Sequence, residues 1–212
     1  MRKYFLSLTI LLLLNFCTNT EVGDIIKLPE PKKEGGMPLY EALNKRKSLR
    51  DFNDSIEVPQ EILSQALWSC YGFNEDQHRT VPSAKSWYPF LVYVFLKDGV
   101  YKYNPLAHEL IKLFDGDHRA VSGTQTSIVT KAAINFVFIG NLRKESRIKN
   151  DSDKHLAFKL DIGHITQVLS LFAAANDMKG VVRGNVHTDQ LLDFLHLSPN
   201  DYAFTLAFSL GY

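Results

Sequence analysis

The sequence predicts a single α+β domain whose central sheet is largely antiparallel and covered by helices. Segments with helical spacing of apolar residues alternate irregularly with short β-branched and aromatic runs, which is typical of this class. With 212 residues, 45% of them hydrophobic, the chain is long enough for one sizeable core.

The N-terminus has the features of a secretory signal. Basic residues 1–3 precede apolar residues 4–16, a run too short for a comfortable membrane span. Cleavage before Cys17 and acylation of its thiol is the sharper interpretation, although Asn15 and Phe16 are larger than the residues that usually precede a lipidated cysteine. Plain secretion and an uncleaved anchor are the alternatives. We expect an exported domain that faces the periplasm or cell surface and meets the membrane only through this anchor.

Proline, glycine and charged residues dominate the next segment, residues 18–37, and predict a flexible tether. The folded domain is expected over residues 38–212. A first helix is predicted over residues 38–46 and a second over residues 59–68, with Gly72 as its stop.

Strands are expected next. Residues 91–96 and 100–103 predict a β-hairpin with a tight primed turn at Asp98-Gly99. Residues 107–114 are interpreted as a short helix, and residues 132–139 as a buried central strand.

The longest helix is predicted over residues 153–176, where Gly163 would let another backbone approach closely. A short strand at residues 181–182, a helix over residues 189–195 and a closing strand over residues 204–210 complete the domain.

Charge and motifs exclude several functions. A net charge of +1 without a sustained basic run indicates no nucleic-acid partner. Phosphate-loop, dinucleotide-binding, nucleophile-elbow and zinc-protease motifs are missing, and the scattered histidines predict no metal site. Cys70 is expected to be a buried packing residue. If the protein is an enzyme, a bound organic cofactor must therefore bring most of the chemistry.

Three segments remain as candidate binding elements. In an extended chain Arg46, Ser48 and Arg50 share one face, and two guanidinium groups with a hydroxyl suit a phosphate monoester. A solvated basic turn is the alternative. In the second segment, residues 79–89, small side chains let backbone amides approach a flat heterocycle, although taken alone it is only a turn.

The third segment is a strand that ends in Arg183-Gly184. Gly184 permits close backbone approach, and Arg183 is suited to an anionic ring or a phosphate. The alternative is that Gly184 is only a turn glycine and that Arg183 forms a salt bridge at the surface.

Together these segments resemble the nitroreductase-like flavoproteins, and most closely the SagB-type thiazole/oxazole dehydrogenases. The resemblance rests on Arg46-x-Ser48-x-Arg50, on residues 80–84 and on Val182-Arg183-Gly184, and it covers residues 38–212. It implies a dimeric α+β fold with FMN at the subunit interface. NAD(P)H would be the electron donor, and the flavin would then reduce or oxidise a second small molecule.

The resemblance also assigns the site. The FMN phosphate and ribityl chain would lie on Arg46, Lys47, Ser48 and Arg50, and the flavin N5 near Arg183 and Gly184. The flavin ring would lie against a loop of the other subunit, formed by Pro82, Ser83 and Ala84.

Two departures from the family pattern bear on these expectations. The chain ends at Gly211-Tyr212, without the basic extension of many nitroreductases, so phosphate binding would depend on Arg46, Arg50 and Arg183. Lys85 stands where SagB-type sequences often have glycine. Two functions follow: an exported FMN-dependent oxidoreductase, or an exported binding or structural domain that keeps the fold without redox activity.

Overall fold

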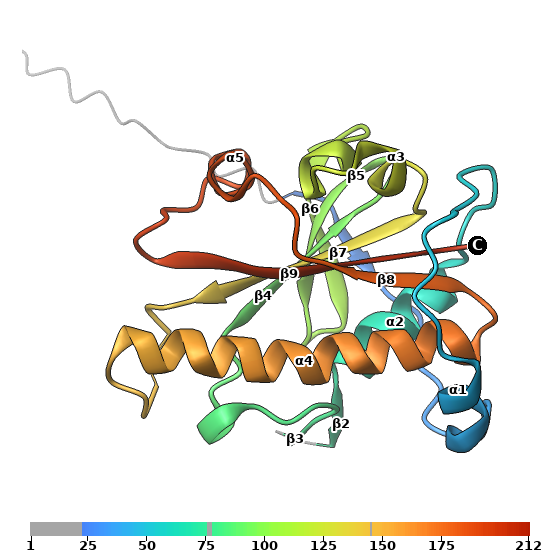
Figure 1. The fold of residues 1–212 in the computed structure, drawn as a ribbon, viewed down its shortest axis with the longest axis horizontal. Helices are drawn as coiled ribbons and strands as arrows, with labels where there is room; N and C mark the ends of the chain where they lie inside the picture. The colour runs from blue at the N-terminus through green and yellow to red at the C-terminus, as the bar shows by residue number, and fades with distance from the viewer. Residues whose placement is uncertain (1–22, 76–77, 145) are drawn as a thin grey trace, which may run out of the picture.

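The computed structural model describes residues 23–75, 78–144 and 146–212. The proposed signal segment, residues 1–17, and Cys17 with it, lie outside the described residues. The core of the molecule is a seven-stranded sheet in the order β1-β6-β5-β4-β7-β9-β8, in which every neighbouring pair is antiparallel. The predicted α+β class with a largely antiparallel sheet is confirmed (Figure 1).

The strands of this sheet are β1 Ile25–Lys27, β4 Phe90–Phe95, β5 Gly99–Asn104, β6 Glu109–Asp115, β7 Ile134–Asn141, β8 Lys179–Arg183 and β9 Tyr202–Gly211. A separate small sheet pairs β2 Phe73–Glu75 with β3 His78–Arg79. The helices are α1 Leu39–Lys45, α2 Gln60–Tyr71, α3 Thr126–Val129, α4 Asp151–Ala175 and α5 Thr188–Phe194, with 3₁₀ turns η1 Ala84–Ser86 and η2 Arg119–Ser122.

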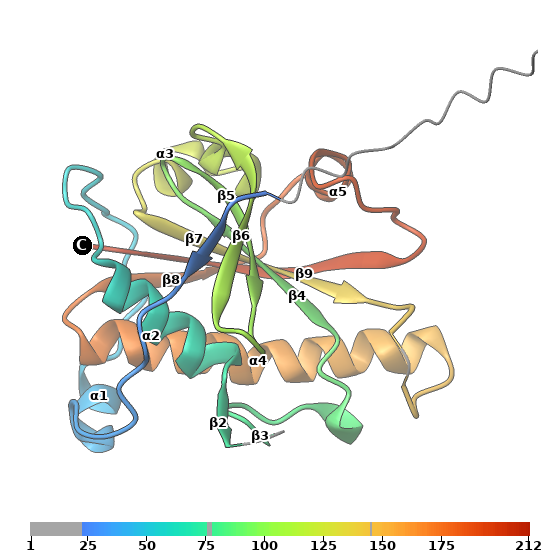
Figure 2. The same ribbon diagram turned by 180° about the vertical axis from the view of Figure 1, so that it is seen from behind.

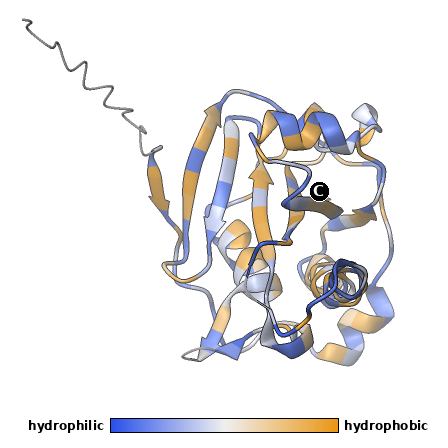
Figure 3. Cartoon of the chain, turned by 90° about the vertical axis from the view of Figure 1, so that its left-hand side faces the viewer, coloured by the Kyte–Doolittle hydropathy of each residue, from blue (hydrophilic) through white to orange (hydrophobic). Residues whose placement is uncertain are grey.

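Helices cover both faces of the sheet, as Figure 3 shows with α4 seen nearly end-on. Alternate side chains of a strand point to opposite faces, so β4 contributes to two cores. Val92 and Val94 belong to the core under α2 and α4, whereas Tyr93 and Phe95 belong to the core under α5. This is why β4 and β7 are apolar along nearly their whole length.

The helices predicted over residues 38–46, 59–68, 153–176 and 189–195 are confirmed as α1, α2, α4 and α5. The helix α2 ends at Gly72 as expected, and Cys70 within it is fully buried. The Asn150 side chain caps α4 by accepting a hydrogen bond of 2.8 Å from the Asp153 amide. By length and composition α4 could cross a membrane, but half of its most apolar window is buried in the domain, which identifies it as a core helix.

Two local predictions are wrong. Residues 107–114 form strand β6 rather than a helix, because this segment pairs with β5 on one side and β1 on the other. The hairpin between β4 and β5 turns at Lys97-Asp98, since the Leu96 amide donates to the Gly99 carbonyl at 2.9 Å. Neither turn residue has a positive φ, so the turn is not a primed one.

The expected tether is attached to the domain over its described part. Figure 2 shows β1 lying along β6, with Ile26 opposite Leu110. The Ser64 hydroxyl donates a hydrogen bond of 2.5 Å to the Pro29 carbonyl, and the Lys32 amide donates to the Gln65 side chain at 2.7 Å. The ordered domain therefore begins before residue 38, the expected boundary.

Candidate functional site

The first predicted binding segment follows α1 and runs beside β8. The Leu49 amide donates a hydrogen bond of 3.1 Å to the Gly180 carbonyl, which places the segment along this edge strand. Arg46 is half-buried, while Lys47, Ser48 and Arg50 are exposed. Within the described part of the chain, no ion pair or hydrogen bond involves the side chains of Arg46, Ser48 or Arg50. Their donors are therefore free to meet an anionic group.

The third predicted segment lies at the same edge of the sheet. Val182 is 37% exposed and Gly184 is exposed, although their neighbour Arg183 is buried. A Cβ atom added to Gly184 would come no closer than 3.6 Å to Leu206, so the backbone here is open to a ligand. The structure thus places the Arg46–Arg50 segment beside Gly180, near the start of β8, and Gly184 just past the end of the same edge strand.

The Arg183 side chain turns away from this open edge into the domain. Its Nε donates to Ser209 Oγ at 2.7 Å, its Nη1 to the Ser122 carbonyl at 2.9 Å and its Nη2 to Asn135 Oδ1 at 3.1 Å. Burial lowers the pKa of the guanidinium to about 10. These hydrogen bonds do not support the expected contact between the Arg183 side chain and a phosphate. The alternative of a surface salt bridge is wrong, because the group is 5% exposed and its acceptors are neutral.

The second predicted segment is held by a carboxylate of α4. Ser83 Oγ donates to Asp161 Oδ2 at 2.5 Å, and the Ala84 amide donates to Asp161 Oδ1 at 2.9 Å. The Tyr88 amide in turn donates to Ser83 Oγ at 2.8 Å. Pro82 is exposed beside this anchored pair. The loop is thus a rigid projection rather than a plain turn.

Sequence reasoning missed Asp161. The residue is 2% exposed and lies between Ala157 and Ile165 on the buried side of α4. A carboxylate at a core position of an amphipathic helix must find hydrogen-bond donors inside the protein. The signal was therefore available as an acid interrupting the apolar side of a predicted helix.

The predicted site is split along α4 within one chain. The loop contacts α4 at Asp161, whereas β8 packs on it at Ala173, where a Cβ on Gly180 would lie 2.9 Å from the Ala173 Cβ. Twelve helical positions separate the two (173 − 161), which corresponds to about 18 Å of helical rise. Figure 1 shows η1 and α1 near different ends of α4.

Another side of α4 is open. Leu156 and Leu160 are 56% and 57% exposed, and a Cβ on Gly163 would meet nothing within 4 Å. The close neighbour that the sequence predicted at Gly163 is therefore not supplied by the described part of this chain. The exposed stripe instead offers an apolar surface to another molecule.

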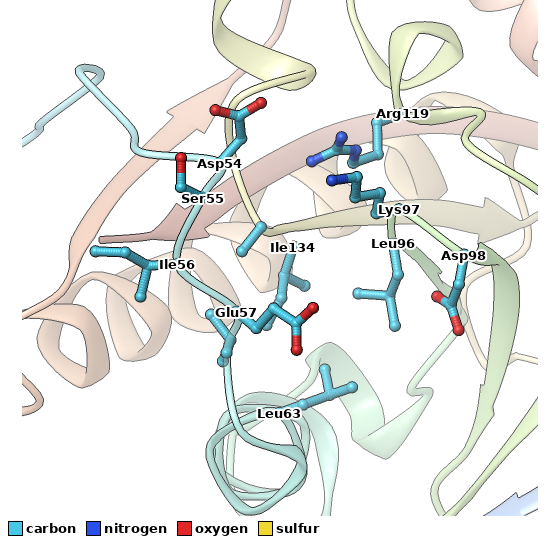
Figure 4. Close-up of a pocket in the computed structure, with 12 residues that line it drawn as sticks. Asp54, Ser55, Ile56, Glu57, Leu63, Leu96, Lys97, Asp98, Arg119 and Ile134 are labelled. Atoms are coloured by element: carbon cyan, nitrogen blue, oxygen red, sulfur yellow. The ribbon is translucent and has the colours of Figure 1, made fainter.

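A cavity of about 490 Å³ lies where β4 ends and β7 begins, at the other end of β4 from the Ser83 loop (Figure 4). Its walls mix Asp54, Glu57 and Asp98 with Lys97 and Arg119. The Arg119 guanidinium is already neutralised by Asp117, with hydrogen bonds of 2.9 and 2.7 Å. None of the predicted site residues lines this cavity.

Comparison with known proteins tests the resemblance directly. The model of the nitroreductase family matches residues 43–212, which is most of the chain. The chain belongs to the nitroreductase family. A protein of Methanocaldococcus jannaschii that is named as a nitroreductase is 27% identical over 186 residues, covering 83% of this chain and 92% of the relative.

Solved structures of this nitroreductase-family fold agree. A protein of Ralstonia eutropha JMP134 described as a nitroreductase matches with a TM-score of 0.81 and 30% identity, over 88% of each chain. A chain of the Escherichia coli microcin synthetase McbBCD complex matches with a TM-score of 0.69 and 18% identity, over 99% of this chain and 84% of that one.

A third solved structure contains the cofactor. It is a Desulfovibrio desulfuricans protein described as a nitroreductase in complex with FMN, with a TM-score of 0.58 and 21% identity, over 84% of this chain and 87% of that one. The resemblance noted from the sequence is confirmed at the level of the family and its fold.

Proposed function

We propose that this protein is an FMN-dependent oxidoreductase that acts on a small molecule as a homodimer. The observation that carries the proposal is the cationic segment with free donors, Arg46, Ser48 and Arg50, beside the edge strand β8. Two guanidinium groups and a hydroxyl match the charge and hydrogen-bonding capacity of a phosphate monoester. The FMN complex of a relative with the same fold supports the choice of ligand.

The residues present fit this cofactor. Arg46, Ser48 and Arg50, with Lys47 beside them, would hold the phosphate and ribityl chain, and the backbone at Arg183 and Gly184 would lie near the ring. When bound, FMN would supply hydride transfer, with NAD(P)H as the donor. The protein would bind, orient and shield the ring, which is consistent with the lack of an assigned acid or base.

The homodimer follows from the split site. A loop that is anchored at Asp161, about 18 Å of helical rise from Ala173, is better placed to cover the flavin of a second copy. The exposed stripe of Leu156, Leu160 and Gly163 on α4 provides an apolar surface for that association. In this arrangement Pro82, Ser83 and Ala84 of each copy would complete the site of the other.

We further propose that the enzyme is exported. The basic start, the apolar run and Cys17 support a lipoprotein signal. Export can be tested by labelling cells with radioactive palmitate and comparing the natural chain with Cys17→Ser. Incorporation lost only in the variant supports the anchor, whereas an unlabelled natural chain contradicts it.

The cofactor assignment has a direct test. The purified full chain should be yellow and show a flavin spectrum, and Arg46→Ala combined with Arg50→Ala should lose most of the bound FMN. A charge-matched control, Lys33→Ala with Lys131→Ala, changes two exposed lysines outside the segment and should stay yellow. Full flavin content in the Arg46/Arg50 variant would contradict the phosphate assignment. If added FMN neither binds nor raises the Tm of the natural chain, the domain without redox activity is the better description.

A further inference from the structure

A second cavity, of about 710 Å³, opens directly after the loop that holds Ser83 and Ala84. Lys85 and Tyr88 form one wall and Arg79 of β3 another. Lys144, Arg147 and Lys149, which lie between β7 and α4, form the third. The backbone at Lys85 has a φ of 54° and at Ser86 a φ of 55°, a left-handed conformation that is costly for residues other than glycine. The surrounding structure therefore holds Lys85 and Ser86 in this conformation.

The described walls of this cavity carry charge of one sign. Five of the residues that line it are cationic and none is acidic; the cations are Arg79, Lys85, Lys144, Arg147 and Lys149. No ion pair within the described ranges involves any of these five side chains. A concave space with several cations on its described walls attracts small anions.

The Arg79 cation is partly withdrawn from water. The Arg79 guanidinium lies 4.1 Å from the centre of the Phe73 ring and 5.4 Å from that of Tyr88, and its Nη1 donates to the Tyr71 carbonyl at 2.7 Å. Burial lowers the pKa of Arg79. Burial and the neighbouring charge of Arg79 lower that of Lys144, whose Nζ donates to the Tyr88 carbonyl. Aromatic rings fix the guanidinium, so one face of the cavity is both cationic and apolar.

We propose that this cavity binds the carboxylate, or a similar small oxyanion group, of an organic substrate. The inference rests on the proposed function, because the cavity continues from the loop that would cover the flavin of the second copy. The five cations would attract and hold the anionic group, and Phe73, Tyr88 and the 84% exposed Leu106 would contact an apolar body. Lys85, which replaces the glycine of many SagB-type sequences, is then part of substrate selection.

A pair of probes with the same ring and different charge tests the proposal. Calorimetry on the full chain, with and without added FMN, should show that 4-nitrobenzoate binds at least roughly tenfold more tightly than neutral 4-nitrobenzamide, and that added salt reduces the difference. With dithionite-reduced flavin, the second-order rate constant for flavin reoxidation should favour 4-nitrobenzoate in the same sense.

Variants locate the effect. Arg147→Gln with Lys149→Gln changes two exposed side chains and should weaken binding of the anion by roughly three- to tenfold without affecting the amide. Lys33→Gln with Lys131→Gln, two exposed lysines that do not line the cavity, should leave both affinities unchanged. Lys85→Gly suits the left-handed backbone and should keep the fold. It should also weaken binding of the anion without affecting the amide.

The two proposals fail in different ways. If FMN is bound but the two probes bind equally, or if the control pair weakens the anion as much as the cavity pair, the anion site is overturned and the proposed function stands. If no FMN binds while the cavity variants selectively lose 4-nitrobenzoate, the anion site stands and the flavin assignment fails.

Discussion

The Ser83 hydroxyl donates a hydrogen bond of 2.5 Å to the Asp161 carboxylate, which also accepts from the Ala84 amide. One buried acid of α4 thus fixes two residues, Ser83 and Ala84, of the loop that the family resemblance places against a flavin. Its two oxygens are shared between a side chain and a backbone donor, so the loop cannot shift without breaking both bonds.

Asp161→Asn should loosen this loop. The amide retains one acceptor oxygen where two are used, so we expect a loss of about 1–3 kcal/mol in the free energy of unfolding. FMN should also bind more weakly, because the loop would cover the flavin less well. Urea unfolding and FMN titration measure the two effects.

A double-mutant cycle with Ser83→Ala separates loop positioning from general destabilisation. The effects of Asp161→Asn and Ser83→Ala on FMN affinity should be less than additive, since both remove the same bond. Additive effects on affinity would show that Asp161 does not act through Ser83.

Gly123→Ala should destabilise the domain through Arg183. An added Cβ would lie 2.1 Å from the Arg183 Nη1 and 3.1 Å from a methyl carbon of Val129. The buried guanidinium would have to leave Ser122 and Asn135, and we expect a cost of about 1–3 kcal/mol, measured by thermal or urea unfolding. An unchanged midpoint would show that Arg183 moves without loss.

Gly163→Ala is the matched glycine substitution with the opposite expectation. Its Cβ meets nothing within 4 Å and the residue is inside α4, so helix propensity should add about 0.5–1 kcal/mol to the stability of the isolated chain. Destabilisation of a chain shown to be monomeric would contradict this.

Leu160→Glu should dissociate the proposed homodimer. The side chain is 57% exposed on the open stripe of α4, so the charge costs little in the monomer but would be desolvated in an interface. Light scattering should show a dimer for the natural chain and a monomer for the variant. Ile25→Glu, at a position 52% exposed on the edge strand β1, is the control and should remain dimeric. A natural chain that is monomeric but retains FMN would refute the shared site.

Acid should weaken the packing of the N-terminal segment through His108. Its Nε2 lies 2.7 Å from Ser64 Oγ and its Nδ1 lies 2.9 Å from the Tyr103 hydroxyl. Burial lowers the pKa of His108, so the folded protein prefers the neutral ring. This contribution to stability is complete above the unfolded pKa of about 6.5 and is lost as the pH falls below it towards the lower folded value.

His108→Asn gives the comparison, because asparagine tolerates the φ of 51° at this position and does not titrate. Between near-neutral and mildly acidic pH, the urea midpoint should fall more for the natural chain than for the variant. Equal falls would show that other groups cause the pH dependence.

Much of the fold was predictable from local pattern. Helix α4 shows its period over many turns, and Gly72 terminates α2 as expected. Strand β6 is predicted wrongly as a helix, because seven residues are too few to show a clear period and one of its two strand partners, β1, is distant in the chain. The attachment of residues 25–27 to β6 was missed for the same reason.

By itself the sequence determined the family, the class of fold and the residue types of the segment proposed to bind a phosphate, because motifs and periodicity are local properties. Only the tertiary structure decided that Arg183 points inward, that Asp161 holds the Ser83 loop, and that five cations surround one cavity. These arrangements depend on side chains from distant segments meeting in space, and hydrogen bonding, burial and charge repulsion act only once they have met.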